Sequence, residues 1–165
     1  MKKIFILLCL IGLMSCEGDS PYSGYAAFFS VDATHEPFRQ IFGYGEFITI
    51  KRKTHSSYEV TDVLGNKYEK RLSEFEMRQG FQYGYGGFIV GTDYENILRV
   101  FDWACPHCDL SIHRLEVQNP GFAYCENCHT RYDLRYGGIP VEGESRKRLW
   151  RYNIFQAGNI ITIQN

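Results

Sequence analysis

The sequence lacks the features of several large classes of protein. After residue 13 no stretch is apolar enough to span a bilayer, which takes about 20 apolar residues. It contains no useful helical periodicity, no serine–histidine–acid order, no phosphate-binding loop and no carboxylate pair. Lysine and arginine total 18 against 19 acidic residues, so the net charge of −1 does not favour nucleic acid as a partner. We therefore expect neither an enzyme nor a nucleic-acid-binding protein.

The N-terminal segment combines a short positive start with an apolar run over residues 4–13. Together they describe a secretory signal peptide. The residues that follow, ending in Ser15 and Cys16, resemble a bacterial lipobox, and this resemblance implies that Cys16 is acylated and becomes the new N-terminus. The alternative is an ordinary signal peptide with a chance cysteine. We expect a lipoprotein signal peptide over residues 1–15 and a flexible, lipidated tether over residues 16–21.

The leader contains no twin-arginine pair, which bears on the route of export. Its absence indicates the general secretory route, along which the chain travels unfolded. Because two or more lipid chains anchor a protein stably, an acylated Cys16 would hold the domain at a membrane surface. We expect a location in the bacterial cell envelope, at the outer membrane in a Gram-negative organism. The expected partners are the membrane itself and an unidentified envelope protein.

The rest of the chain is rich in residues that strands and tight turns prefer, since the sequence contains 12 Tyr, 12 Phe and 16 Gly. Residues 46–51 and 58–63 alternate polar and apolar side chains, which is typical of half-buried strands. We expect one all-β domain over residues 22–165. Its expected strands are 25–31, 46–51, 58–63, 67–71, 88–90, 97–102, 113–117, 122–124, 131–134, 148–155 and 159–163.

Four other segments complete this prediction. Residues 72–78 are the only short helical candidate, and residues 137–140 are expected to form a turn. Residues 80–87 are rich in Gly, Tyr and Phe, which predicts a loop with packing aromatics. Residues 81–86 of this loop are the first candidate for a contact surface. The basic run over residues 146–148 predicts a solvated strand end.

Four of the six cysteines form two C-x-x-C pairs. Cys105 and Cys108 make the first pair, Cys125 and Cys128 the second, and residues 109–124 separate them. A C-x-x-C in a tight turn places two thiolates on one side of the backbone, and two facing turns complete a tetrahedral metal site. The alternatives are two disulfides, because secreted chains oxidise their cysteines, and free thiols. A thioredoxin-like redox motif is disfavoured because no helix follows either pair.

The residues around these pairs follow a particular order. Cys105 and His107 form a C-x-H, Cys125 opens a second loop, and the chain continues with Arg131-Tyr132-Asp133, Gly137-Gly138, Pro140 and Leu149-Trp150-Arg151-Tyr152. Over residues 87–154 this order resembles a Rieske-type iron–sulfur domain, whose ligands are C-x-H in one loop and C-x-x-H in the other. The resemblance implies a Rieske-like antiparallel β domain with a metal-binding subdomain at about residues 100–137.

The chain departs from that family at the site itself. Cys128 stands where the family has its second ligand histidine, His129 comes one place later, and Cys108 restores a C-x-x-C in the first loop. Three occupants are therefore open: Zn²⁺ on the four cysteines, one rubredoxin-like iron, or a 2Fe-2S cluster on Cys105, Cys125 and Cys128 with His107 or Cys108. Export as an unfolded chain favours Zn²⁺, because iron–sulfur clusters are normally installed inside the cell. If they do not bind the metal, His107 and His129 are only sequence neighbours of its ligands.

The choice of metal decides the expected function. Zinc held by four thiolates has no open coordination position and no redox chemistry, so it would be a structural element of a membrane-anchored binding module. A 2Fe-2S cluster would instead indicate an electron carrier that needs a redox partner at the same membrane. Rieske domains of oxygenases feed a separate catalytic domain, and this chain is too short to contain one.

Overall fold

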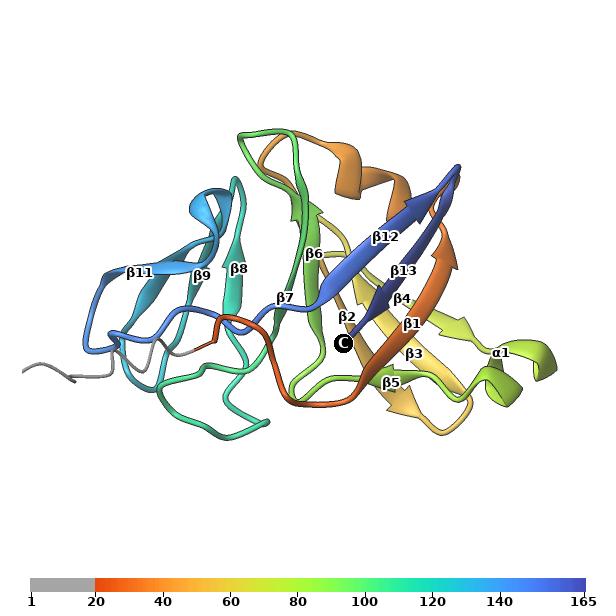
Figure 1. Cartoon of the computed structure of the whole chain (residues 1–165), viewed down its shortest axis with the longest axis horizontal. Helices are drawn as coiled ribbons and strands as arrows, with labels where there is room; N and C mark the ends of the chain where they lie inside the picture. The colour runs from red at the N-terminus through yellow and green to blue at the C-terminus, as the bar shows by residue number, and fades with distance from the viewer. Residues whose placement is uncertain (1–19) are drawn as a thin grey trace, which may run out of the picture.

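The computed structural model describes residues 20–165, and this part of the chain is all-β, as predicted (Figure 1). The expected signal peptide over residues 1–15 and the acylation site Cys16 lie outside the described residues, as does most of the tether over residues 16–21. Among the described residues, no helix is both long and apolar enough to cross a membrane.

The strands form three antiparallel sheets. The central sheet has the order β4 (Lys67–Arg71), β3 (Ser57–Thr61), β2 (Phe47–Thr54), β6 (Phe88–Thr92) and β7 (Leu98–Asp102). The terminal sheet has the order β12 (Asn153–Ala157), β13 (Ile160–Gln164), β1 (Ala27–Asp32) and β5 (Gln82–Tyr83). The cysteine sheet has the order β11 (Ile139–Glu142), β10 (Arg131–Asp133), β9 (Phe122–Tyr124) and β8 (Glu116–Gln118).

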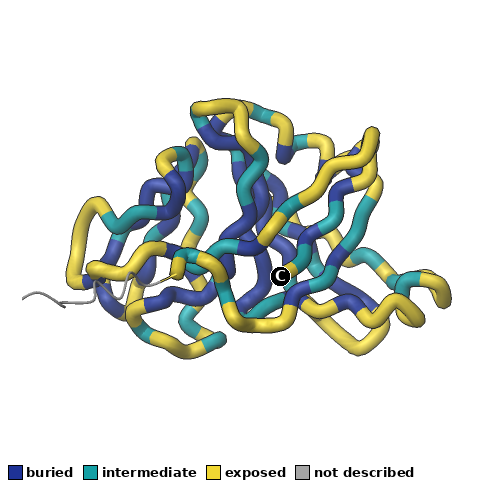
Figure 2. The backbone as a smooth tube through the Cα atoms, viewed as in Figure 1, coloured by how far each residue is buried: buried dark blue, intermediate teal, exposed yellow. Residues whose placement is uncertain are grey.

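The central sheet is covered on both faces, and Figure 1 shows it between the other two sheets. Successive side chains of a strand point to opposite faces. Ile48 and Ile50 of β2 therefore enter a first core that includes Phe29 of β1 and Ile163 of β13. Phe47, one residue away, enters a second core. Double coverage explains why β6 is buried along its whole length (Figure 2).

The second core lies between the central and cysteine sheets. Ile89 of β6 and Phe101 of β7 point into it, opposite to their neighbours Val90 and Val100, which belong to the first core. Three of its buried members are cysteines, and the remaining buried members are Phe47, Leu115, Ala123, Tyr132, Leu134 and Leu149. The four-cysteine region is thus part of a hydrophobic core.

The two ends of the described chain meet in the terminal sheet. β1 pairs with β13 in antiparallel register, with Phe29 opposite Ile163, and β12 extends the sheet as a hairpin with β13. This pairing joins residues far apart in sequence and closes the first core over the central sheet.

A strand overlaps each expected range, and three expectations need correction. Residues 137–140 were expected to be only a turn, but β11 begins at Ile139; Pro140 is accommodated because β11 is an edge strand. Residues 148–152 are not a continuous strand, since they cross between sheets with isolated pairing to Phe101. The basic run over 146–148 is therefore irregular backbone. Residues 80–87 contain the short β5.

The helical segments are short. α1 (Glu74–Gln79) confirms the helical candidate, and a capping box between Ser73 and Glu76 fixes its start. Two 3-10 segments, η1 (Phe38–Phe42) and η2 (Leu134–Tyr136), were not expected. η1 places Phe38 and Ile41 in the first core, where Phe38 packs on Phe29.

Candidate metal centre

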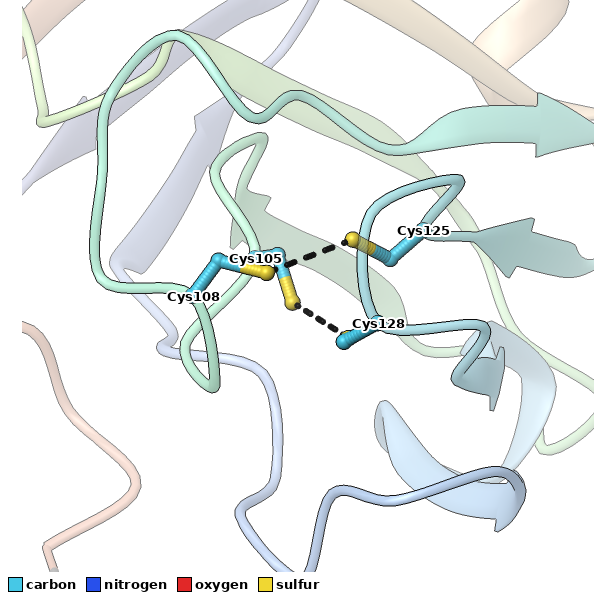
Figure 3. Close-up of side chains that lie close together, drawn as sticks. All are labelled: Cys105, Cys108, Cys125 and Cys128. Carbon is cyan, nitrogen blue, oxygen red and sulfur yellow. Dashed lines mark hydrogen bonds between the residues drawn. The ribbon is translucent and has the colours of Figure 1, made fainter.

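Two loops beside the cysteine sheet carry the four cysteines. The first loop runs from β7 to β8 and contains Cys105 and Cys108; the second joins β9 to β10 and contains Cys125 and Cys128. β9 and β10 are paired up to Tyr124 and Arg131, so the second cysteine pair lies at a hairpin tip. Figure 3 shows the four side chains converging between the two loops.

The sulfur atoms lie at the separations expected of ligands to one metal ion. Cys105 Sγ is 3.6 Å from Cys128 Sγ, and Cys108 Sγ is 3.7 Å from Cys125 Sγ (Figure 3). All four sulfurs lie within 4.8 Å of one another. None of these cysteines is in a disulfide, whose sulfurs would be about 2.05 Å apart. The four cysteines are thus close enough together to hold a metal ion, as their spacing predicted.

The two cysteine turns share an unusual backbone feature. The residue after each second cysteine adopts a left-handed conformation, with φ of 50° at Asp109 and 53° at His129. Aspartate and histidine are among the non-glycine residues found there most often. Equivalent kinks therefore lead the chain out of both turns, while each pair of sulfurs remains on one side of the backbone.

Hydrogen-bonding groups surround the sulfurs. Asn127 Nδ2 donates to Cys108 Sγ at 3.2 Å, and the buried Tyr132 hydroxyl lies 3.5 Å from Cys105 Sγ. Thr130 Oγ1 lies 3.3 Å from Cys128 Sγ. In that contact the Cys128 thiol donates and Thr130 Oγ1 accepts, whereas the Asn127 amide donates to sulfur and the Tyr132 hydroxyl can do so. Donors such as these stabilise thiolates and orient them toward a common centre.

Burial opposes ionisation of these thiols. It raises the pKa of Cys108 and Cys125, in spite of hydrogen bonds from Asn127 that lower both. Burial acts in the same direction on Cys128, but there the hydrogen bonds from the Thr130 side chain and backbone prevail, so the pKa of that thiol is lowered. Several thiolates this close together are stable only beside a cation that offsets their charge.

The two candidate histidines lie outside the group of converging ligand atoms. His107 is exposed, and its Nε2 lies 3.9 Å from Glu144 Oε2. His129 Nδ1 forms a 2.9 Å hydrogen bond with the Tyr124 hydroxyl. Neither histidine forms a hydrogen bond to a cysteine sulfur within residues 20–165.

A buried carboxylate supports the first cysteine turn. Asp102 accepts hydrogen bonds from the backbone N–H of Tyr85, Gly86 and Ala104, and from the Tyr152 hydroxyl, at 2.5–2.9 Å. Burial raises the pKa of Asp102, against the lowering effect of these bonds. The carboxylate thus ties the turn to the Gly- and Tyr-rich segment and to the chain before β12. Its role could not be predicted from the sequence, where the only signal was an acidic residue at the end of an apolar strand.

No protein-family model, curated protein or solved structure matches this chain. The Rieske-like identity therefore stays a resemblance of sequence, and the findings that stand are an all-β fold and a cluster of four cysteines that can bind a metal.

Proposed function

We propose that this protein is a lipid-anchored module of the bacterial cell envelope whose four cysteines hold one structural Zn²⁺. The observation that carries the metal assignment is the separation of the sulfurs. A tetrahedron with zinc–sulfur bonds of about 2.3 Å has sulfur–sulfur edges of about 3.8 Å. The separations of 3.6 Å between Cys105 and Cys128 and 3.7 Å between Cys108 and Cys125 are close to that edge.

The surroundings of the sulfurs support a structural rather than a catalytic role for the metal. Cys105, Cys125 and Cys128 are buried, and four thiolate ligands leave no coordination position for water or substrate. The sulfurs also belong to the second core, so a bound metal would join its two loops. Its function would then lie in a surface that the metal keeps in shape, as in a binding module.

A 2Fe-2S electron carrier is the second candidate, favoured by the sequence resemblance. A 2Fe-2S cluster divides its four protein ligands between two irons, so the two pairs of ligands lie farther apart than the ligands of a single ion. The observation that all four sulfurs lie within 4.8 Å, with His107 outside the group, favours a single ion. A single rubredoxin-like iron has the same ligand set as zinc, and only its chemistry distinguishes it.

Elemental and spectroscopic analysis of protein matured in its own envelope tests this proposal. We expect a colourless protein with one zinc per chain. Two irons with acid-labile sulfide would establish the electron carrier instead, and one iron without sulfide the rubredoxin-like site. Cys128→Ser should lower the metal content, whereas Ser111→Ala, in the first loop but outside the sulfur group, should not.

The anchor is tested separately, by mass spectrometry of the mature chain. We expect its first residue to be an acylated Cys16. An N-terminal peptide without acyl groups, or one that begins elsewhere, would contradict the lipoprotein assignment and leave the metal assignment untouched.

A further inference from the structure

Three consecutive basic residues, Arg146, Lys147 and Arg148, form an exposed loop between two buried residues. On one side, Ser145 donates its backbone N–H to Thr130 Oγ1 at 3.0 Å, and its hydroxyl accepts from the backbone N–H of Lys147 at 3.1 Å. On the other side, the backbone N–H of buried Leu149 donates to Gly138 at 2.9 Å. The loop is thus held at both ends, and the three basic side chains face solvent.

This loop lies beside the first described residues of the chain (Figure 1). The backbone N–H of Arg151 donates to Pro21 at 2.7 Å, and that of Ser23 donates to Arg151 at 2.8 Å. A recess of about 330 Å³ lies between the two segments and is lined by Ser20, Pro21, Arg146, Lys147, Arg148 and Trp150. The tether and the basic loop therefore share one face of the molecule.

The charge of this loop is not neutralised within the fold. Among residues 20–165, no ion pair includes any of its three basic residues. The acidic side chains nearest in sequence, Glu142 and Glu144, each lie 3.9 Å from another group, Arg131 and His107 respectively. The recess is thus lined by basic side chains without an acidic one.

Aromatic side chains complete the composition of this face. Trp150 lines the recess and packs edge-on against Tyr25 and Tyr85, with ring centroids 5.5 and 6.0 Å away. Tyr22, next to Pro21, is 54% exposed. Tryptophan and tyrosine beside lysine and arginine are the composition of membrane–water interfaces, where the rings lie at the level of the headgroups.

The length of the tether decides what lies opposite this face. Fully extended, the chain from Cys16 to Ser20 spans at most about 14 Å. If Cys16 carries lipid in a bilayer, Ser20 and the recess beside it are therefore held close to the headgroups. Basic side chains near an anionic lipid surface are attracted to it, and the attraction falls off within a Debye length of about 8 Å.

We propose that Arg146, Lys147 and Arg148 form a docking surface for the anionic phospholipid headgroups of the membrane that holds the anchor. This proposal depends on the lipid anchor proposed above and adds an orientation to it. The basic loop faces the bilayer, and because the backbone of the loop is already fixed, docking orders only its side chains.

Chemical protection of Lys147 tests this orientation. The mature, acylated protein is placed in phosphatidylethanolamine vesicles with or without phosphatidylglycerol, and in neutral detergent micelles. A water-soluble acetylating reagent is added, and each lysine is followed by mass spectrometry. We expect Lys147 to react severalfold more slowly on phosphatidylglycerol vesicles than in micelles, and high salt to remove the protection. Lys67, exposed at the start of β4, should react equally in all samples.

A matched pair of variants isolates the role of the loop. Arg146→Gln with Arg148→Gln should abolish the protection of Lys147, whereas Lys67→Gln with Lys70→Gln, which removes the same charge from β4, should preserve it. If protein that floats with phosphatidylglycerol vesicles shows unprotected Lys147, or if protection is equal without phosphatidylglycerol, the docking proposal is overturned. Protein that does not float and carries no acyl group would instead refute the anchor, and docking with it.

Discussion

The two cores rest on opposite faces of the central sheet but are built from different chemistry. The first lies under the terminal sheet and consists of aromatic and aliphatic side chains, with Phe29 packed against Tyr58, Phe81 and Phe88. The second lies under the cysteine sheet, whose strands are only three or four residues long, and includes three cysteines. We therefore expect the first core to stay folded without a metal and the second core to depend on the metal proposed for the four cysteines.

The largest effect should come from removing the proposed zinc. Cys125→Ser, or complete chelation, should unfold the two cysteine loops, because structural zinc contributes about 10–16 kcal/mol in zinc-finger peptides and metal binding is coupled to folding. Hydrogen exchange is the measurement. Amides of β9 and β10 should lose protection while those of β1 and β13 keep theirs. Equal loss in both regions, or no loss, would contradict the division into two cores.

Phe29→Ala tests the same division by weakening the first core instead of the second. Phe29 is fully buried, so we expect a loss of about 3–5 kcal/mol in the free energy of unfolding. Metal content should stay the same, since Phe29 belongs to the first core, as do its aromatic neighbours Phe38, Tyr58, Phe81, Tyr83 and Phe88. Phe155→Ala, at a 54% exposed position of β12, is the control and should change stability little. Loss of metal from the Phe29 variant would show that the cores are coupled.

Asp102→Asn tests the junction between the cores. An amide cannot accept all four hydrogen bonds, so we expect a loss of about 1–3 kcal/mol, measured by denaturant unfolding. Tyr152→Phe, which removes only one donor, should cost less. A loss for Tyr152→Phe as large as for Asp102→Asn would show that the hydrogen bond from the Tyr152 hydroxyl, and not the three backbone donors, accounts for the contribution of the carboxylate.

The raised pKa of Asp102 also predicts that the free energy of unfolding depends on pH. In the folded state the pKa of Asp102 is raised above its ordinary 3.8, mainly by burial, so the carboxyl binds its proton more tightly in the folded than in the unfolded chain. Its stabilising contribution is complete below pH 3.8 and is lost as the pH rises through the raised pKa. The stability of the wild type relative to Asp102→Asn should therefore fall as the pH rises from 3.8. A rising difference would contradict this assignment.

Ser73→Ala should have the smallest effect. It removes the capping box of α1, a helix with no buried residue, and should cost about 1 kcal/mol at most. Circular dichroism and thermal unfolding would measure the loss. Because α1 belongs to neither core, metal content and the protection of β1 should not change; a change in either would give the helix a larger role than its contacts suggest.

Local patterns predicted much of this fold. The alternation of polar and apolar side chains predicted β2 and β3. The two C-x-x-C pairs predicted the cluster of sulfurs. The pattern could not show that β2 is covered on both faces, because that depends on sheets formed by distant residues. The prediction of a turn over residues 137–140 was wrong for β11, because Gly137, Gly138 and Pro140 are residues typical of turns.

The supporting contacts of the site could not be predicted either. Asp102 and Tyr152 are 50 residues apart, and Thr130 meets Ser145 only because the chain returns past the second cysteine turn. Neither pair has a local signature. The basic run over residues 146–148 was likewise interpreted as a strand end, and only the fold places it beside Ser20 and Pro21 at the end of the tether.

The pairing of β1 with β13 has a consequence for biogenesis. A chain that leaves the ribosome or a translocation channel N-terminus first presents β1 long before β13. The first core therefore cannot close until β13 has emerged. All the buried residues of the second core lie between residues 47 and 149, so they have emerged before β12 and β13 appear. The four cysteines can thus meet while the opposite half of the molecule is still open.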